Sequence, residues 1–260
     1  KQSVNHAARL NRTLSVLSDV NQSIVRTRDR SVLFDQACQI AVEKGEFRMA
    51  WIGLFDMETQ QVSPVAHAGV TEDYLQKLNI SLNDISRGNG PAGQSIRTAQ
   101  PAVVNNIATD PTMMPWREDA LRLQYNSIAS LPLIVSGDVR GMIALYHRES
   151  DFFDAEELKL VEEMAGDIAF AMEFIEQDNQ RKLAEQQVKH LNRTLNMLSD
   201  INQAIVRTED TQTLFEDACK LAVEKGGFRM AWIGILDLST NRADPVTSAG
   251  LVGDYLEVAL

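Results

Sequence analysis

The chain has 260 residues, of which 44% are hydrophobic and 23% charged, as is common in globular proteins. Its formal net charge of −11 argues against non-specific binding to nucleic acid or anionic lipid. No apolar run approaches the roughly 18–20 residues of a membrane span. The two cysteines are too few for a disulfide framework, which favours a reducing, cytoplasmic location. Because the chain opens with Lys1 and shows no signal-peptide pattern, we interpret it as a piece of a longer protein.

One phrase, FRMAWIG, occurs at 47–53 and again at 228–234. A shift of 181 positions aligns Leu10–Gly69 with Leu191–Gly250, and about 37 of those 60 positions are identical. A period of this length indicates tandem domains rather than a solenoid. We therefore expect one whole domain followed by the opening part of a second one.

The first whole domain is expected to begin with a helix and a β-hairpin. Residues 31–44 carry apolar side chains at i, i+3 and i+4, and Gly45 can stop the helix. Residues 47–56 are expected to form a strand. Residues 62–69 are expected to form its hairpin partner, and Pro64 favours a position at the sheet edge.

The middle of this domain alternates short helices with strands. A short helix is expected at 71–78, and residues 87–100 predict a loop followed by a helix with Pro91 at its first position. Residues 109–124 predict another loop and helix, with Pro115 near the helix start. Further strands are expected at 101–107, 127–135 and 139–147.

From Asp154 to about Thr208 the chain has no proline and predicts one long helix. Apolar residues step by three and four along it, as in a coiled-coil seam: Leu158, Val161, Ala165, Ile168, Met172, Ile175, Leu191, Leu195, Leu198, Ile201 and Ile205. A helix of about 50 residues spans about 75 Å, more than one domain needs. Residues Leu10–Val25, ahead of the first domain, repeat the LNRTL pattern that begins at Leu191 in the long helix. We predict a homodimer through these flanking helices; the alternative is a helix folded back on its own sheet.

The phrases FRMAWIGLFD, PVAHAG, RGNGPAGQSIRTAQPAVVNNIATDP, PWREDALRLQYNSIASLPLI and GMIALY, in that order, resemble a bacterial GAF domain. The resemblance covers about 31–176 and again 212–260. It implies an α+β fold in α/β/α layers: an antiparallel sheet of about six strands with helices on both faces, flanked by long coiled-coil-like helices. The expected parts are a dimerisation helix at 1–30, a GAF-like sensor domain at 31–153, a connector helix at 154–210, and a truncated second GAF-like domain at 211–260.

The resemblance also implies a non-catalytic, regulatory role in a signal-transduction protein, such as a two-component sensor histidine kinase or a diguanylate cyclase. A kinase or cyclase output domain would then lie downstream, and no contact with nucleic acid or membrane is expected from this segment. Two functions stay open. The module either binds a small molecule and relays the change, or is a ligand-free dimerisation and relay module.

In similar domains the segment 87–130 forms a lid over the sheet. Met113 and Trp116 suit a mostly apolar pocket, and the helix start after Gly90 offers N–H groups to a carboxylate or phosphate. Alternatively, Trp116 caps the core and Arg117 pairs with a nearby acid. The candidate ligand-binding residues are Trp51, Arg87, Asn89, Gln94, Asn105, Asp110, Met114, Trp116, Arg117, Ser127 and Ser130.

The sequence also argues against several chemistries. It has no phosphate-binding GxxxxGK[ST] loop, HExxH or CxxC motif, and no metal site or resident cofactor is expected. Bilin-binding and methionine sulfoxide-reducing members of the family need pocket cysteines, whereas Cys38 lies on an apolar helix stripe. His147, a conceivable haem ligand, is interpreted as a solvated strand-end residue. The acid pairs Glu156–Glu157 and Glu162–Glu163 are interpreted as a solvated helix face.

The second copy raises one more expectation. Its MAWIGILDL segment at 230–238 would lie without the strands that should pair beside it. We therefore expect this apolar edge to find partners in another chain.

Overall fold

The computed structural model describes residues 2–69, 74–84, 87–207, 210–239 and 241–251, with side chains described from Leu10 onward. The chain divides into two compact units, Lys1–Asp178 and Asn179–Leu260. Among the described residues, no helix combines the length and the apolar character that crossing a membrane requires.

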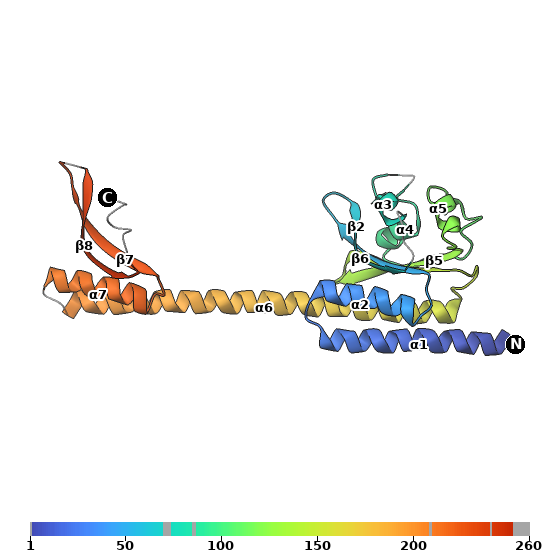
Figure 1. Cartoon of the computed structure of the whole chain (residues 1–260), viewed down its shortest axis with the longest axis horizontal. Coiled ribbons are helices and arrows are strands. Elements are labelled where there is room, and N and C mark those ends of the chain that lie inside the picture. The colour runs from blue at the N-terminus through green and yellow to red at the C-terminus, as the bar shows by residue number, and fades with distance from the viewer. Residues whose placement is uncertain (1, 70–73, 85–86, 208–209, 240, 252–260) are drawn as a thin grey trace. The chain divides into compact units, whose positions relative to one another are not determined.

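The first unit is built on a six-stranded antiparallel sheet with the strand order β3-β2-β1-β6-β5-β4 (Figure 1). Strand β1 pairs with β2 on one side and with β6 on the other, so FRMAWIG supplies a central strand. The strands are β1 (Met49–Asp56), β2 (Gln61–Gly69), β3 (Ile80–Ser81), β4 (Ala102–Val104), β5 (Ser127–Val135) and β6 (Asp138–His147).

Helices cover both faces of this sheet, which confirms the predicted α+β fold in three layers (Figure 1). One face carries α1 (Gln2–Arg26), α2 (Arg30–Glu43) and the first part of α6 (Ala155–Arg207). The other face carries α3 (Tyr74–Leu78), α4 (Pro91–Thr98), the 3-10 turn η1 (Pro111–Met113) and α5 (Arg117–Arg122).

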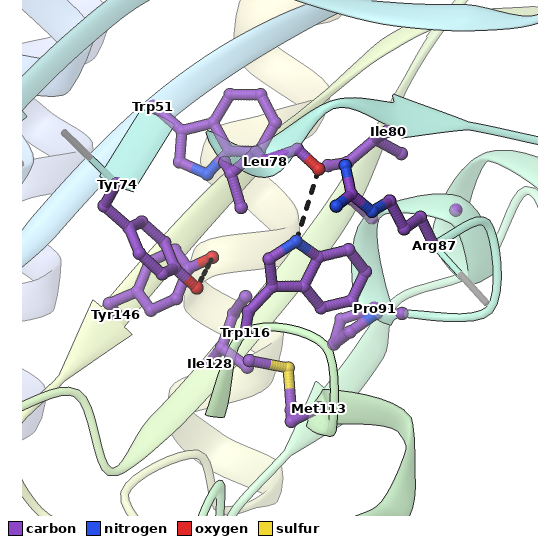
Figure 2. Close-up of a pocket in the computed structure, with 13 residues that line it drawn as sticks. Trp51, Tyr74, Leu78, Ile80, Arg87, Pro91, Met113, Trp116, Ile128 and Tyr146 are labelled. Carbon is purple, nitrogen blue, oxygen red and sulfur yellow. Dashed lines mark hydrogen bonds between the residues drawn. The ribbon is translucent and has the colours of Figure 1, made fainter. Parts of the chain in front are cut away.

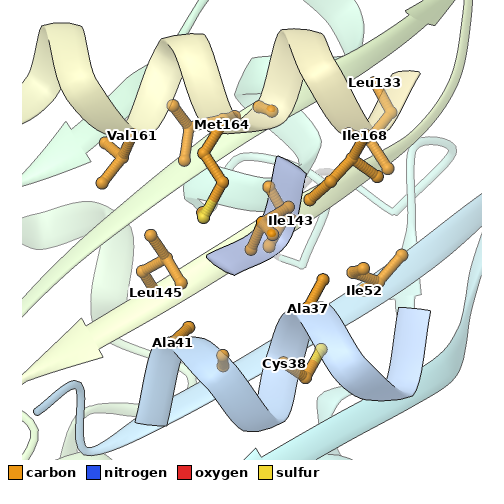
Figure 3. Packing of buried hydrophobic residues seen from close by; sticks show 14 of the residues in the cluster. Ala37, Cys38, Ala41, Ile52, Leu133, Ile143, Leu145, Val161, Met164 and Ile168 are labelled. Carbon is orange, nitrogen blue, oxygen red and sulfur yellow. The ribbon is translucent and has the colours of Figure 1, made fainter. Parts of the chain in front are cut away.

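Two separate cores follow from the alternation of side chains along the strands. In β1, Ala50 and Ile52 belong to the cluster under α1, α2 and α6, part of which Figure 3 shows. Met49 and Trp51 belong to the cluster under α3, α4 and α5. All four are buried, because a strand with a two-residue period buries every residue when both faces are covered.

Strand β2 is expected at the edge of the sheet because of Pro64, but it lies one strand inside the edge. Strand β3, which the sequence analysis missed, pairs outside β2, but only at Gln61 and Val62. Pro64 lies beyond this pairing and opposite Gly53, where the register between β1 and β2 shifts. A proline is tolerated there because its missing N–H leaves no ladder bond unmade.

Two further boundaries differ from the sequence prediction. Helix α5 covers only Arg117–Arg122 of the predicted 109–124 segment, with Trp116 as its N-cap and Pro115 just before the cap, near the helix start as predicted. Strand β4 covers only Ala102–Val104, since Asn105 turns away to hold Phe153. Short elements have few ladder bonds, so side-chain contacts decide where they end.

The first part of the predicted coiled-coil seam is a core face. Val161, Ile168 and Ile175 are buried against the sheet and α2 (Figure 3), so here the helix is folded back on its own sheet. The second part differs, because Leu191 and Leu195 are 58% and 53% exposed in the single chain. The sequence pattern alone could not separate these two surroundings.

Glu157 corrects the expectation of a solvated acidic face. Its carboxylate Oε2 accepts a hydrogen bond of 2.7 Å from the Thr13 hydroxyl, and both side chains are buried. This contact joins α1 to the start of α6.

The second unit repeats the start of the first. It contains the end of α6, then α7 (Thr211–Glu224), β7 (Met230–Asp237) and β8 (Arg242–Gly250). Met230 pairs with Gly250 as Met49 pairs with Gly69, and the register shifts at the equivalent place. Burial differs, however, because β7 and β8 form a two-stranded sheet among the described residues.

Shortening a side chain on the buried face of α6 should destabilise the first unit. We expect Ile168→Ala to lower the free energy of unfolding by about 2–5 kcal/mol, because it leaves a cavity in the core. Phe170→Ala, two residues along at a 68% exposed position, should cost about 0.5 kcal/mol or less. Urea unfolding followed by circular dichroism measures both. A large loss for Phe170→Ala would show that this side chain is covered in solution.

Candidate functional site

A small cavity lies between the sheet and the helices of the 87–130 lid (Figure 2). Its volume is about 10 Å³, about the space that one water molecule requires. Thirteen residues line it: Trp51, Tyr74, Leu78, Ile80, Arg87, Gly90, Pro91, Ala92, Gly93, Met113, Trp116, Ile128 and Tyr146. They come from the sheet, from α3, from the start of α4 and from the segment before α5.

The indole of Trp116 occupies the middle of this site (Figure 2). Its Nε1–H donates to the carbonyl oxygen of Leu78 at 3.2 Å, and the residue is 7% exposed. A Cβ on Gly90 would lie 2.5 Å from the Cζ3 atom of this ring. Gly90 is therefore required for the ring to lie flat against the start of α4.

The other glycines of RGNGPAG serve the packing of the loop before α4. A Cβ on Gly93 would lie 2.1 Å from the Gly88 carbonyl oxygen. Arg97 holds the same loop, donating to the carbonyl oxygen of Gly88 at 3.2 Å and to Asn89 Oδ1 at 3.2 Å. No side chain caps α4 at its N-cap, Gly90.

Three polar groups meet at the sheet end of the cavity (Figure 2). The hydroxyls of Tyr74 and Tyr146 lie 3.5 Å apart. Burial raises the pKa of Tyr146 to about 12 and raises the pKa of Tyr74 well above its ordinary value, so both stay protonated near neutral pH. A hydrogen-bond interaction of the Trp51 indole with the Tyr146 hydroxyl lowers the pKa of Tyr146. The Nε1–H of that indole nevertheless has no acceptor in hydrogen-bond geometry among the described residues.

Three of the predicted site residues line the cavity, namely Trp51, Arg87 and Trp116. Four others have hydrogen-bond partners outside it. Asn89 accepts a hydrogen bond from Arg97, and the Ser130 hydroxyl is hydrogen-bonded to that of Ser95 at 2.9 Å. Asp110 caps η1 by accepting from the Thr112 N–H at 2.8 Å. Arg117 donates to the Asp110 carbonyl oxygen at 2.6 Å. In this contact Arg117 binds a backbone carbonyl oxygen, whereas the alternative interpretation expected an acid side chain.

The remaining four predicted residues lie away from the cavity. Ser127 donates to the Glu149 carbonyl oxygen at 2.8 Å, and Asn105 makes two hydrogen bonds with the backbone of Phe153. Met114 is 68% exposed, and half-buried Gln94 is not among the lining residues. The spacing of these residues along the chain does not show in which direction their side chains point.

Sequence reasoning missed Tyr74, Leu78, Ile80, Ile128 and Tyr146 as lining residues. A usable signal existed for two of them. Ile128 and Tyr146 are paired across β5 and β6, and Tyr146 is paired with Met49 in the neighbouring strand β1. Residues opposite each other in a sheet share a face, so both join the face of Trp51. The strand order was needed to see this.

Cys38 and His147 lie outside this cavity. Cys38 is on α2, in the cluster on the opposite face of the sheet, and burial raises the pKa of its thiol to about 12. His147 is 8% exposed and stacks on Phe152 at 3.6 Å between ring centroids, so its interpretation as a solvated residue is wrong. No group of His, Cys, Asp or Glu in the described part of the chain could hold a metal ion.

The contact of Trp116 with Gly90 can be tested by adding one methyl group. Gly90→Ala should push the indole out of the cavity and lower the free energy of unfolding by about 1–3 kcal/mol. The matched control is Gly166→Ala in α6, where an added Cβ meets nothing within 4 Å and should stabilise the helix by about 0.5–1 kcal/mol. Acrylamide quenching of tryptophan fluorescence in a Trp232→Phe background reports the combined exposure of Trp51 and Trp116, which should rise in Gly90→Ala. Unchanged quenching in Gly90→Ala would contradict this packing.

Comparisons with known proteins agree with this architecture. Among solved structures, the GAF domain of a phosphoenolpyruvate-protein phosphotransferase from Coxiella burnetii is 16% identical, with a TM-score of 0.56, covering 66% of this chain and 98% of that one. A free methionine-R-sulfoxide reductase from Neisseria meningitidis, solved with its substrate, is 16% identical, with a TM-score of 0.54, covering 64% and 91%. At these identities the likeness shows the fold alone.

No curated protein matches the chain. The family model described as GAF domain matches residues 27–173, which is more than half of the chain. The matched range contains the whole six-stranded sheet and the lid above it. The chain therefore belongs to the GAF domain family.

Proposed function

We propose that the first unit is a sensory, non-catalytic GAF module of a bacterial signal-transduction protein. It binds a small molecule in the cavity under the 87–130 lid and relays the change through dimeric helices to a kinase or cyclase output domain. One observation carries this proposal: among the described residues the buried Nε1–H of Trp51 has no acceptor in hydrogen-bond geometry, although it borders a cavity. An unsatisfied buried donor costs about 1–3 kcal/mol, which an acceptor on a ligand would recover.

The sheet offers a direct route from the cavity to the flanking helices. Trp51 borders the cavity, while its neighbours Ala50 and Ile52 pack in the cluster that contains α1, α2 and α6. A ligand that displaces Trp116 also disturbs the start of α5 and the Leu78 carbonyl at the end of α3. The ligand shifts the helices only if it binds the two arrangements with different affinity.

Exposed apolar residues on α6 support the proposed homodimer. Leu191 is 58% exposed and Leu195 is 53% exposed in the single chain. A second copy packed along this helix would cover such side chains. The second unit is proposed to be the first part of another GAF-like domain. Ile235 and Leu236 on β7 are exposed, and further strands and helices of such a domain would cover them.

The reductases of similar fold raise an enzymatic alternative. The chain has two cysteines, and the one in the first unit, Cys38, is buried on the face opposite the cavity with a thiol pKa of about 12. A thiol attacks as its thiolate, so Cys38 has neither the position nor the ionisation for that chemistry. This supports a non-catalytic role.

The ligand-free relay module stays the second candidate function. The observation that favours it is the small cavity, which Trp116 already fills while donating to Leu78. In that case the module would transmit contacts between neighbouring domains without a ligand.

Native mass spectrometry of the purified chain tests these functions. We expect twice the chain mass plus a discrete, dissociable mass. Trp51→Phe should lose the added mass, because it removes the N–H donor and keeps an aromatic ring. Trp232→Phe, the equivalent change in the second copy, should retain it. A dimer of bare chain mass that also stays unstabilised in thermal-shift screens would favour the relay module, and a monomer would contradict the dimer.

The enzymatic alternative has its own test. The chain with a thiol reductant should reduce free methionine sulfoxide no faster than the reductant alone, and Cys38→Ser should change nothing. Turnover that Cys38→Ser abolishes would overturn the non-catalytic assignment.

A further inference from the structure

The charges around the cavity narrow the chemistry of the ligand that the proposed function requires. Arg87 is the one charged residue among the thirteen that line the cavity, and none of them is Asp or Glu. None of the ion pairs recorded among the described residues includes Arg87. The Asp84 carboxylate accepts from the Arg87 backbone N–H at 3.2 Å but is not among the lining residues. Among the described residues, the Arg87 side chain is therefore the one charge that borders the cavity, which favours an anion and disfavours an ammonium group.

The start of α4 lies at the same end as Arg87 (Figure 2). Gly90 leaves the helix without a side-chain cap, and Ala92 and Gly93 of the first turn border the cavity. First-turn N–H groups have no partner within the helix, and its dipole adds partial positive charge there. A second, independent group points to a ligand, namely the acceptor-free Nε1–H of Trp51, which is 1% exposed.

The shape of the ligand between its two polar ends is inferred from the position of Trp116. The remaining space holds about one water, so a larger ligand takes the place of the Trp116 indole. That place has the planar shape of the indole itself, and it leaves no room for a side chain on Gly90. The surrounding side chains of Tyr74, Leu78 and Ile80 are aromatic or aliphatic. A planar ring therefore fits the centre of the site.

We infer that the ligand is a small aromatic carboxylic acid that carries a polar oxygen on its ring, distal to the carboxylate. This inference rests on the proposed function. The carboxylate lies against Arg87 and the start of α4, and the ring replaces the indole of Trp116. The distal oxygen accepts from Trp51 Nε1–H, beside the hydroxyls of Tyr74 and Tyr146. The freed indole swings outward, which couples binding to the start of α5.

Four probes of matched shape test this inference by isothermal titration calorimetry on the full chain. They are 4-hydroxyphenylacetate, phenylacetate, 4-hydroxyphenylacetamide and tyrosine. The first should bind about tenfold or more tightly than the amide, which lacks the charge, and than tyrosine, whose ammonium finds no acidic partner. It should also bind several-fold more tightly than phenylacetate, which lacks the distal oxygen.

Two substitutions assign these preferences to their residues. Arg87→Gln should remove most of the preference for the acid over the amide, and Arg87→Lys should keep part of it. Arg140→Gln, at an exposed arginine outside the cavity, is the control. Trp51→Phe should bring 4-hydroxyphenylacetate and phenylacetate to within about twofold, whereas Trp232→Phe should not. Circular dichroism verifies that each variant is folded.

The inference is overturned if neither acid binds, if tyrosine binds most tightly, or if folded Arg87→Gln keeps the full preference for the acid. Its failure differs from failure of the proposed function. A retained ligand without a carboxylate in the native mass spectrum would leave the sensor standing and remove only the ligand class. Bare chain mass together with no probe binding would remove both.

Discussion

The two-residue period of the central strands is the constraint on which the rest of the first unit depends. Along β1, alternate residues enter two different clusters, one with α1, α2 and α6 and one with α3, α4 and α5. The same period separates the residues that border the cavity from those that touch the flanking helices. Because Trp51 stands between Ala50 and Ile52, a change at the cavity acts on the strand that the helices pack against.

The cavity combines tight packing with an unmet polar group. The indole of Trp116 closes it against Gly90, and only the missing side chain of that glycine makes room. Beside it, Trp51 keeps a buried N–H that has no acceptor in hydrogen-bond geometry within the described part of the chain. A domain built only for stability would remove such a donor, whereas a domain that exchanges its own ring for a ligand has a use for it.

The internal repeat shows how far local sequence reaches. The phrase FRMAWIG forms the same strand in both units, with the same pairing and the same shift in register. Yet Trp51 is 1% exposed and Trp232 is 38% exposed. The difference comes from β6, which lies beside β1, while β7 pairs only with β8 in the described part of the second unit. Hairpin geometry is thus local, and burial is supplied by distant strands.

The sequence by itself determined most of the helices and strands, the α+β class, the repeat and the family resemblance, because periodicity and turn residues act over a few positions. It also singled out Trp51, Arg87 and Trp116. Only the tertiary structure decided that Ser127 and Asn105 tie loops together, that Val161 and Ile168 form core instead of a coiled-coil seam, and that Tyr74 and Tyr146 meet Trp51. Those outcomes depend on strand order and on which face a helix covers, which join residues more than a hundred positions apart.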